Sequence, residues 1–531
     1  MNPYSDCGPR GPTMKRNPST STLVATLLLA IPVSGTAQES SQPVESVVDT
    51  KPELTRHHRY KLIDTGSFGG PNSHVALGAH VLNNNGTFTG FADTTQPDPY
   101  APDGCWDGDC LVAHVFEWKN GELSDLGVLD AGPNSESNWM SETGLIAGDS
   151  QNGLLDPLTG GWQIRGVLWR HGQRVDLGAL GGGYNSLARG VNDNGQVAGL
   201  STTTVPDSNG MIMSFGLPYP FQTRAFLWKD GVMHDLGTLG GPDAMALGIN
   251  ERGQIFGNSY TNDDPSPACS FPGFDSLTTG AFVWDNGAMV NLGSLGGTCT
   301  NASAMNDAGQ VVGYSFLPGD QVLHPFSWKQ GRLVDLGTIG GTSGVALALN
   351  DGGDIVGAQF LPENDTISHA ILWSRGKITD LEALESGQCS FPSAINSRRQ
   401  VVGVLADCSF DDSTFRAFLW EPGGPIIDLN TLISPDLGIQ LRNAVAINDR
   451  GEIAAVAYFS DGNHRPVLLI PCDEPGTKSE GCPDTENVTT TPNVQVTSPS
   501  TRAPSKRSDR SPTSVATQLR TLLTPRHPRT P

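Results

Sequence analysis

One short segment of the chain combines acidic, aromatic and cysteine side chains at a spacing that could hold a ligand. It reads Asp103-Gly-Cys-Trp-Asp-Gly-Asp-Cys110, so a disulfide between its two cysteines would keep Trp106, Asp107 and Asp109 close together. Oxygen ligands two residues apart can contribute to a calcium site, which makes Asp107 and Asp109 candidate calcium ligands. A solvated acidic turn is the alternative, and we favour it. We therefore expect no cofactor, with calcium as the alternative.

Aromatic side chains point to a second kind of chemistry, stacking against a ligand such as a glycan. The segment Phe215-Gly-Leu-Pro-Tyr-Pro-Phe221 brings Tyr219 and Phe221 together, and Trp106 is a third candidate. The same segment could instead fold back over a sheet edge. The sequence has no evident phosphate-binding loop, Ser-His-Asp arrangement, metal-binding His pair or paired-carboxylate signature. We therefore name no catalytic residues and favour binding over catalysis.

The scaffold that must position these segments is a repeat. About eight versions of one phrase recur every 44–59 residues, as in Asp176-Leu-Gly-Ala-Leu-Gly-Gly182 and Asp335-Leu-Gly-Thr-Ile-Gly-Gly341. Each unit contains four short runs rich in Val, Ile, Phe and Trp, and such runs between turn residues are typical of strands. Turns such as Asn306-Asp-Ala-Gly309 and Trp284-Asp-Asn-Gly287 are hairpin signals, so each unit is predicted to form four antiparallel strands.

A four-stranded sheet that recurs at this period indicates an all-β fold, a β-propeller of about eight blades. The first unit begins with a surplus strand, Tyr60–Thr65, and the last unit ends at Pro466–Ile470 without its fourth strand. We predict that residues 60–65 complete the last blade and close the ring, which leaves no open edge at the seam. Seven blades are the alternative, because Ser141-Glu-Thr-Gly144 and Glu382-Ala-Leu384 are weak copies. An open solenoid is the other alternative.

Most repeated residues are expected to be structural. The Asp of the repeated phrase should bond backbone donors in the turn towards the next blade, and a ring of ligand-binding carboxylates is the alternative. The Trp that ends each third strand should pack between blades, and stacking on a sugar is the alternative. Function is expected in long insertions that do not repeat and that share one predicted face. These insertions span residues 91–112, 149–163, 200–222, 258–279 and 404–415.

The repeated phrases resemble the bacterial extracellular family named for its His-Ala-Phe motif, the HAF repeat family. The phrases that carry the resemblance are Arg224-Ala-Phe-Leu-Trp228, Asp235-Leu-Gly-Thr-Leu-Gly-Gly241 and Asn306-Asp-Ala-Gly-Gln-Val-Val-Gly313. The resemblance covers roughly residues 60–471. His114 and His369 fit the motif, whereas Arg224, Gly280 and Arg416 depart from it. The resemblance implies a secreted bacterial protein and supplies no catalytic residues.

The ends of the chain differ from the repeats in composition. Residues 1–37 are predicted to be a signal peptide, with Lys15 and Arg16 before an apolar run and small residues at its end; Met14 is an alternative start. Residues 38–59 are a linker, and 60–471 form the propeller. Residues 472–531 are rich in Thr, Ser and Pro and are expected to be disordered. No segment of the mature chain is long and apolar enough to predict a membrane span.

Removal of the signal peptide leaves eight cysteines, an even number that suggests disulfides in a secreted chain. In the propeller, the loop between the second and third strands lies on the same face as the link between blades. Neighbouring cysteines in these loops are therefore close enough to pair. The candidate disulfides are Cys105–Cys110, Cys269–Cys299, Cys389–Cys408 and Cys472–Cys482. Zinc binding is the disfavoured alternative, because no Cys-x-x-Cys occurs.

The predicted propeller is strongly acidic. Residues 38–473 contain 49 acidic and 22 basic residues, within a chain whose net charge is −22. This charge argues against binding to nucleic acid or to anionic membranes. We therefore expect a secreted, monomeric module, extracellular, at the cell surface or in the periplasm, that binds an unknown protein or extracellular carbohydrate through its long-loop face. The alternatives are a polysaccharide hydrolase or lyase and a structural envelope component.

Overall fold

The computed structural model describes the propeller and a few residues beside it. The described ranges are 59–76, 80–101, 105–106, 109–207, 220–266, 269, 277–362, 364–409, 411–472 and 482. The predicted signal peptide, nearly all of the linker and the tail, Asp107 and Tyr219 lie outside them. Within these ranges, no helix has the length and apolarity needed to cross a bilayer.

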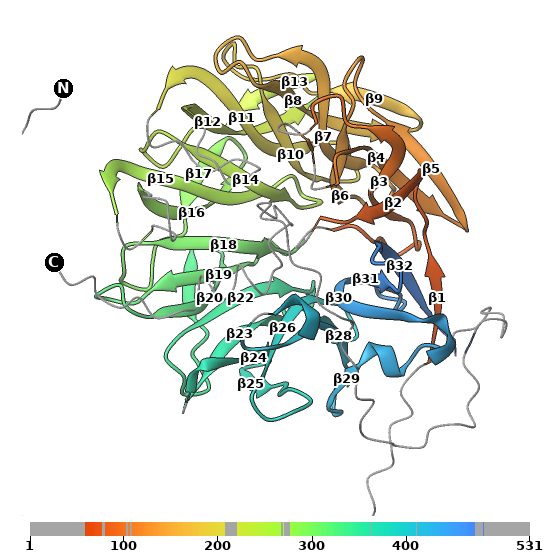
Figure 1. Cartoon of the computed structure of the whole chain (residues 1–531). Helices are drawn as coiled ribbons and strands as arrows, with labels where there is room; N and C mark the ends of the chain where they lie inside the picture. Colours follow the sequence, from red (N-terminus) through yellow and green to blue (C-terminus); the bar gives the residue numbers. More distant parts are fainter. Residues whose placement is uncertain are drawn as a thin grey trace, which may run out of the picture. The chain divides into compact units, whose positions relative to one another are not determined.

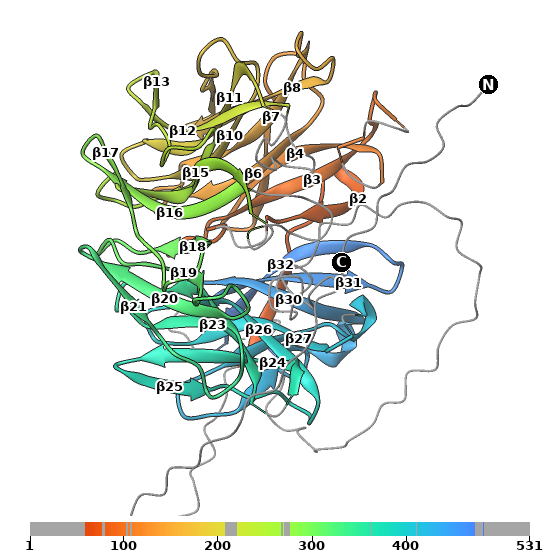
Figure 2. The same cartoon turned by 90° about the vertical axis from the view of Figure 1, so that its left-hand side faces the viewer.

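The described residues form eight four-stranded antiparallel sheets in a ring, which confirms the predicted eight-bladed propeller (Figures 1 and 2). Blades 1 and 2 contain β2 (Gly69–His74), β3 (Phe88–Pro97), β4 (Leu111–Lys119), β5 (Glu122–Gly127), β6 (Ser135–Met140), β7 (Ile146–Leu155), β8 (Trp162–Arg170) and β9 (Gln173–Asp176). Blades 3 and 4 contain β10 (Ser186–Val191), β11 (Val197–Pro206), β12 (Phe221–Lys229), β13 (Val232–Asp235), β14 (Ala244–Ile249), β15 (Ile255–Pro265), β16 (Leu277–Asp285) and β17 (Ala288–Asn291).

The second half of the ring repeats this order. Blades 5 and 6 contain β18 (Thr300–Met305), β19 (Val311–Phe316), β20 (Leu323–Lys329), β21 (Arg332–Asp335), β22 (Gly344–Leu349), β23 (Ile355–Leu361), β24 (Asn364–Ser374) and β25 (Lys377–Asp380). Blade 7 contains β26 (Gln388–Ile395), β27 (Val401–Asp407), β28 (Arg416–Trp420) and β29 (Ile426–Asp428). Blade 8 contains β30 (Ile439–Ile447), β31 (Ile453–Phe459), β32 (His464–Pro471) and β1 (Tyr60–Asp64). The described helices are short 3₁₀ turns, η1 (Asp412–Thr414), η2 (Leu429–Thr431) and η3 (Pro435–Leu437).

The ring closes as predicted, through the first described strand. β1 pairs antiparallel with β32, with Tyr60 opposite Pro471 and Asp64 opposite Val467. The orange-red β1 therefore completes a blade whose other strands are blue in Figure 1. The strand ends one residue earlier than the expected Thr65, whose hydroxyl instead donates to the Pro466 carbonyl at 2.8 Å. Closure between the two ends leaves no unpaired seam between the first and last repeats.

The turn sequences produce the predicted hairpins. In the turn between the third and fourth strands of blade 4, Asn286 and Gly287 both have positive φ, 48° and 89°. Two consecutive positive φ angles define a type I′ turn, which Asn-Gly favours. The hairpin between the first and second strands ends with a left-handed Gly, such as Gly309 at φ 71°. Both hairpin types therefore follow from the local sequence.

The Asp of the repeated phrase has two structural roles. Its carboxylate accepts a backbone N–H two residues along the chain, as from Gly337 to Asp335 at 2.8 Å, which confirms the turn interaction. It also pairs with a cationic or imidazole side chain on the third strand. The pairs are His114–Asp125, Arg224–Asp235, His324–Asp335, His369–Asp380, Arg416–Asp428 and Arg465–Asp64. Blade 4 lacks both partners, because Gly280 and Asn291 stand in their places.

The hydrophobic core lies between neighbouring blades. The Phe two residues before each recurrent Trp is fully buried in most blades, for example Phe116, Phe226 and Phe326 at 0% exposure. The Trp residues are also core residues: Trp169 is 4% exposed and Trp420 is 6% exposed. Burial of these rings supports the structural interpretation of the repeated Trp over sugar stacking.

Candidate binding site in the channel mouth

A ring of asparagines joins the blades around the central channel. In seven blades, the residue just after the innermost strand, or after the isolated bridge residue Leu82 in blade 1, is an Asn whose Nδ2 donates to a backbone carbonyl of the next blade. These bonds run from Asn83, Asn192, Asn250, Asn306, Asn350, Asn396 and Asn448, at 2.9–3.4 Å. Blade 2 carries Ser141 instead. Because the same Asn side chains also accept N–H groups of their own turns, the channel mouth is held rigidly.

A collar of carboxylates surrounds this ring, one residue further along each turn. Its members are Glu142, Asp193, Glu251, Asp307, Asp351 and Asp449, whereas Asn84 and Ser397 occupy the other two blades. Each turn is linked to the next, as when Asp307 N donates to Asp351 Oδ1 at 3.0 Å. Burial, together with the nearby Asp193 and Asp307 charges, raises the pKa of Glu251 above its ordinary value. The carboxylates therefore repel one another at the channel mouth.

The channel mouth encloses a cavity of about 410 Å³. Its wall consists of small and apolar side chains from the innermost strands, and its rim includes five collar residues. The rim carboxylates are Glu142, Glu251, Asp307, Asp351 and Asp449. The cavity belongs to the mouth formed by the short turns between first and second strands. It therefore lies on the face opposite the long insertions that the sequence favoured for binding.

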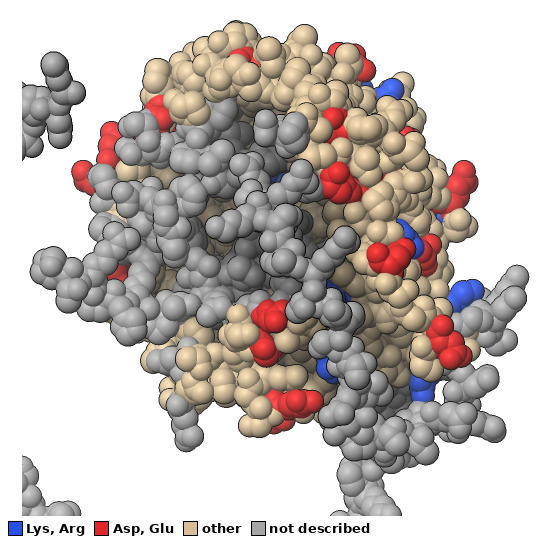
Figure 3. All heavy atoms as spheres, viewed as in Figure 1, with Lys and Arg blue, Asp and Glu red and all other residues tan. Residues whose placement is uncertain are grey.

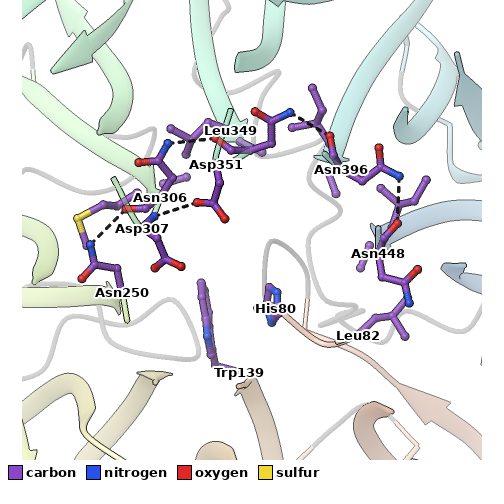
Figure 4. A pocket seen from close by; sticks show the side chains of 18 of the residues that line it. His80, Leu82, Trp139, Asn250, Asn306, Asp307, Leu349, Asp351, Asn396 and Asn448 are labelled. Carbon is purple, nitrogen blue, oxygen red and sulfur yellow. Dashed lines mark hydrogen bonds between the residues drawn. The ribbon is translucent and has the colours of Figure 1, made fainter. Parts of the chain in front are cut away.

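Two aromatic rings in this cavity break the repeat. Trp139 lies opposite Ala147 in blade 2, at the register position that six other blades fill with Gly or Ala. Those residues are Gly190, Gly248, Ala304, Ala348, Ala394 and Ala446. The His80 ring stacks on Trp139, with centroids 5.5 Å apart and planes tilted by 26°. Figure 4 shows both rings pointing into the cavity, across from Asp307 and Asp351.

The positions of the two rings are set by their surroundings. His80 Nδ1 lies 2.7 Å from the Met140 carbonyl oxygen, and its Nε2 lies 3.8 Å from Glu142 Oε1. β6 carries a bulge between Ser137 and Trp139. A bulge re-aims the following side chain. The residue within the bulge, Asn138, is anchored by a 2.9 Å bond from its Nδ2 to Asp149 Oδ2.

A buried polar cluster lies beside this bulge. Asp149 is fully buried and accepts the Ala188 N–H at 2.9 Å as well as the Asn138 bond. Burial raises the pKa of Asp149 to about 7; Arg189 opposes the rise, and the Glu136 carboxylate opposite on β6 adds to it. Burial also raises the pKa of Glu136. This cross-strand pair of carboxyl groups was not apparent from the sequence.

The structure places the other candidate residues in supporting positions. Trp106 is 9% exposed, and its backbone N–H donates to Asp98 at 3.1 Å. Asp109 accepts the Leu111 N–H at 3.0 Å and the Asn72 side-chain amide at 2.9 Å, so it stabilises a turn. Phe221 begins β12 and is half-buried, opposite Pro206. Asp107 and Tyr219 lie outside the described residues. Within the described ranges, no cluster of three or more His, Cys, Asp or Glu side chains could hold a metal ion.

The four candidate disulfides are present in the structure. They join Cys105 to Cys110, Cys269 to Cys299, Cys389 to Cys408, and Cys472 to Cys482. The second disulfide connects a long loop to a link between blades, and the third connects the loop after β27 to the start of β26. The neighbouring pairing inferred from the blade model is therefore confirmed.

Sequence reasoning missed Trp139, His80 and the carboxylate collar. The signal for the collar was available, because an acidic residue follows the turn Asn in most copies. Trp139 is a large residue at a position that six other blades fill with Gly or Ala, but this alignment requires knowledge of the bulge between Ser137 and Trp139. The sequence of that unit is a weak copy of the repeat, which concealed its alignment with the other blades.

Comparison with known proteins gives remote structural similarities and no relative in sequence. No protein-family model and no curated protein matches this chain in sequence. The β-propeller domain of the Trilobed protease from Pyrococcus furiosus is similar in structure, at 9% identity and a TM-score of 0.37, over 61% of this chain and 89% of that one. A puromycin-hydrolyzing peptidase of Mycobacterium tuberculosis gives 10% identity and a TM-score of 0.38, over 75% of this chain and 61% of that one. Porphyromonas gingivalis dipeptidyl peptidase 4 gives 8% identity and a TM-score of 0.36, over 76% of this chain and 59% of that one. This chain thus spans less than two thirds of the two peptidases.

Proposed function

We propose that this protein is a binding module whose channel mouth captures a cationic group, such as the ammonium or guanidinium group of a basic peptide. The observation that carries the proposal is the pair Trp139 and His80, which occupies a cavity that the repeat would otherwise line with Gly and Ala. Trp139 packs in part against the core between blades 2 and 3, but six other blades fill the same register position with Gly or Ala. Residues that depart from the repeat inside a cavity are the expected mark of a ligand site.

The chemistry around the aromatic pair selects the class of ligand. A cation over a Trp face gains about 0.5–2 kcal/mol from the ring quadrupole. The carboxylates of Asp307 and Asp351 face the same cavity and supply the opposite charge (Figure 4). Acidic side chains also outnumber basic ones on the face of the described residues shown in Figure 3. The long-range field therefore attracts cations, and the aromatic pair would fix one of them.

The proposal replaces the long-loop face with the channel mouth as the binding surface. A polysaccharide hydrolase or lyase remains the rival function, and the cross-strand pair Glu136 and Asp149 is the observation that favours it. Asp149 is fully buried, however, and neither carboxyl group lines the cavity. A buried carboxyl group cannot reach a polymeric substrate without rearrangement, so binding is the better-supported function.

We further propose that the chain is a secreted, monomeric HAF repeat protein of bacterial origin, as its sequence resemblance implies. The four disulfides support a non-cytoplasmic protein, because disulfides persist in oxidising compartments. Mass spectrometry of the protein recovered from the culture medium would test secretion and signal cleavage together. Retention of the uncleaved protein inside the cell would contradict this proposal.

Calorimetric titration of the full chain with tetralysine tests the binding function. We expect saturable binding that weakens with salt, no binding of tetra-acetyl-lysine, and at least a roughly tenfold loss in Trp139→Ala, since tenfold corresponds to about 1.4 kcal/mol. Trp162→Ala is the matched control, because this half-buried Trp lies in the long-loop hairpin of blade 2. Equal affinities in the two variants, or release of product from a glycan, would contradict the proposal.

A further inference from the structure

A groove between blades 6 and 7 gathers three basic side chains in an otherwise acidic protein. The groove has a volume of about 620 Å³ and is lined by β25, by the turn before it, and by the turn from Pro422 to Pro425. Its basic residues are Arg375, Lys377 and Arg399. The whole chain has 33 basic and 55 acidic residues, so such a convergence does not follow from composition.

Arg399 occupies a backbone position that the repeat reserves for glycine. It ends the turn between β26 and β27, with a left-handed φ of 64°. The corresponding residue in the other seven blades is a left-handed glycine, with φ between 71° and 85°: Gly86, Gly144, Gly195, Gly253, Gly309, Gly353 and Gly451. A side chain with a Cβ is disfavoured in this conformation. An unfavourable residue at one copy of a repeat points to a function for its side chain.

Among the residues that the structure describes, the three cations have no side-chain partner. Within the described residues, none of them makes an ion pair or a side-chain hydrogen bond. Of the two acidic residues in the groove, Asp380 is engaged with His369 at 3.0 Å. Asp380 and Glu382 together offset two of the three positive charges. The groove therefore carries net positive charge, and Arg375 and Lys377 at its rim are exposed to solvent.

We infer that this groove binds an oxyanion, a sulfate, phosphate or carboxylate group, carried on an extended acidic ligand. Two guanidinium groups can each donate paired hydrogen bonds to an oxyanion, and the lysine adds a point charge. The groove is far larger than one free anion, which favours a chain bearing several such groups. The groove is separate from the channel mouth and shares none of its lining residues, so this inference can be tested independently of the cation-binding function.

Arg399→Gly gives a sharp test, because it should affect binding and stability in opposite directions. The full-length variant should bind a sulfated, heparin-type oligosaccharide at least tenfold more weakly than the wild type. Its melting temperature should rise, since glycine removes the backbone strain. The pair Arg375→Gln with Lys377→Gln should weaken binding to a similar extent. The matched control is Lys329→Gln with Arg332→Gln, in the turn between the third and fourth strands of blade 5. There the next blade carries Gly353 at the position that Arg399 holds in blade 7.

The probes distinguish the sources of the oxyanion. Binding of inorganic sulfate alone, with the same loss in Arg399→Gly, would assign the groove to a free anion. Binding of the oligosaccharide or of a polyuronate at much lower concentration would assign it to an acidic chain. If neither probe binds, if Arg399→Gly binds as well as the wild type, or if the blade 5 control loses as much affinity as the groove variants, the inference is overturned.

Discussion

Replacement of Asp149 by Asn should remove a large part of the pH dependence of stability between pH 4 and pH 8. Asp149 is fully buried, and burial raises its pKa from 3.8 to about 7. The charged and polar groups that face it are Glu136 on β6, Arg189 and the Ala188 N–H on β10, and the Asn138 amide. Because the pKa is raised on folding, stability is fully present below pH 4 and is lost as the pH rises towards 7.

The magnitude follows from the pKa change. An Asp whose pKa rises from 3.8 to about 7 on folding costs the folded state up to about 4 kcal/mol above pH 7. For a domain of this size, this loss corresponds to a fall in melting temperature of about 4 °C. Asn should also impose a cost at all pH values of roughly 1–3 kcal/mol, because its amide would face the amide of Asn138. The wild type should therefore be the more stable protein at pH 4.5, and the variant should match or exceed it at pH 8.

Scanning calorimetry of both proteins across this pH range would measure the difference directly. Blade 4 provides a natural precedent, since Asn258 occupies the equivalent position and accepts the Ala302 N–H at 2.9 Å. Asp193→Asn is a control in which the pH dependence of stability should have the opposite sign. Burial alone would raise the pKa of Asp193, but hydrogen bonds from Thr143 and Ser141 hold that pKa below its ordinary value. That variant should lose stability relative to the wild type as the pH rises above 4. Parallel pH curves for the wild type and Asp149→Asn would refute the reasoning.

Three further predictions concern the scaffold. Asn306→Ala should lower the unfolding free energy by about 2–4 kcal/mol, because it leaves the buried Asn350 carbonyl and the Gln310 N–H without their partner. Thermal melting would measure the loss, with Asn84→Ala, outside the Asn ring, as the control. Deletion of the chain up to residue 64 should abolish cooperative melting or cause self-association, whereas deletion up to residue 58 should not, as light scattering would reveal. Cys389→Ser with Cys408→Ser should cost about 2–4 kcal/mol, measured as a fall in melting temperature relative to the oxidised wild type.

The fold could be predicted because every unit repeats the same local signals. Turn sequences and strand periodicity gave the four-stranded blade, and the surplus strand near Tyr60 gave the closure. The weak copies were the uncertain part, and the structure shows that both are true blade elements. Ser141 still closes its turn by accepting the Gly144 N–H at 3.1 Å. Glu382 takes the left-handed position of the repeated phrase at φ 65°. Tertiary pairing thus preserves the blade where the local sequence departs from the pattern.

The channel site could not be predicted in the same way. Alternation along a strand assigns side chains to two faces, but it does not show which residue of an innermost strand reaches the channel. In β6 that assignment depends on a bulge that shifts the register between Ser137 and Trp139. His80 lies beside the isolated bridge residue Leu82 and not in a regular strand, so no strand periodicity in the sequence indicates that its side chain faces the channel. Arg399 was the exception, because its departure from the turn glycine is visible in the sequence once the blades are aligned.

The most direct test of the proposed function is to observe the Trp139 indole while a cationic ligand binds. The chain contains 10 Trp residues, so ¹⁵N-indole labelling gives a small set of resonances, and Trp139→Phe would assign the relevant one. We predict that tetralysine shifts the Trp139 indole resonance in a saturable manner and leaves the buried Trp residues between blades unchanged. A shift confined to Trp162, or no shift at concentrations that saturate binding, would contradict a cation site in the channel mouth.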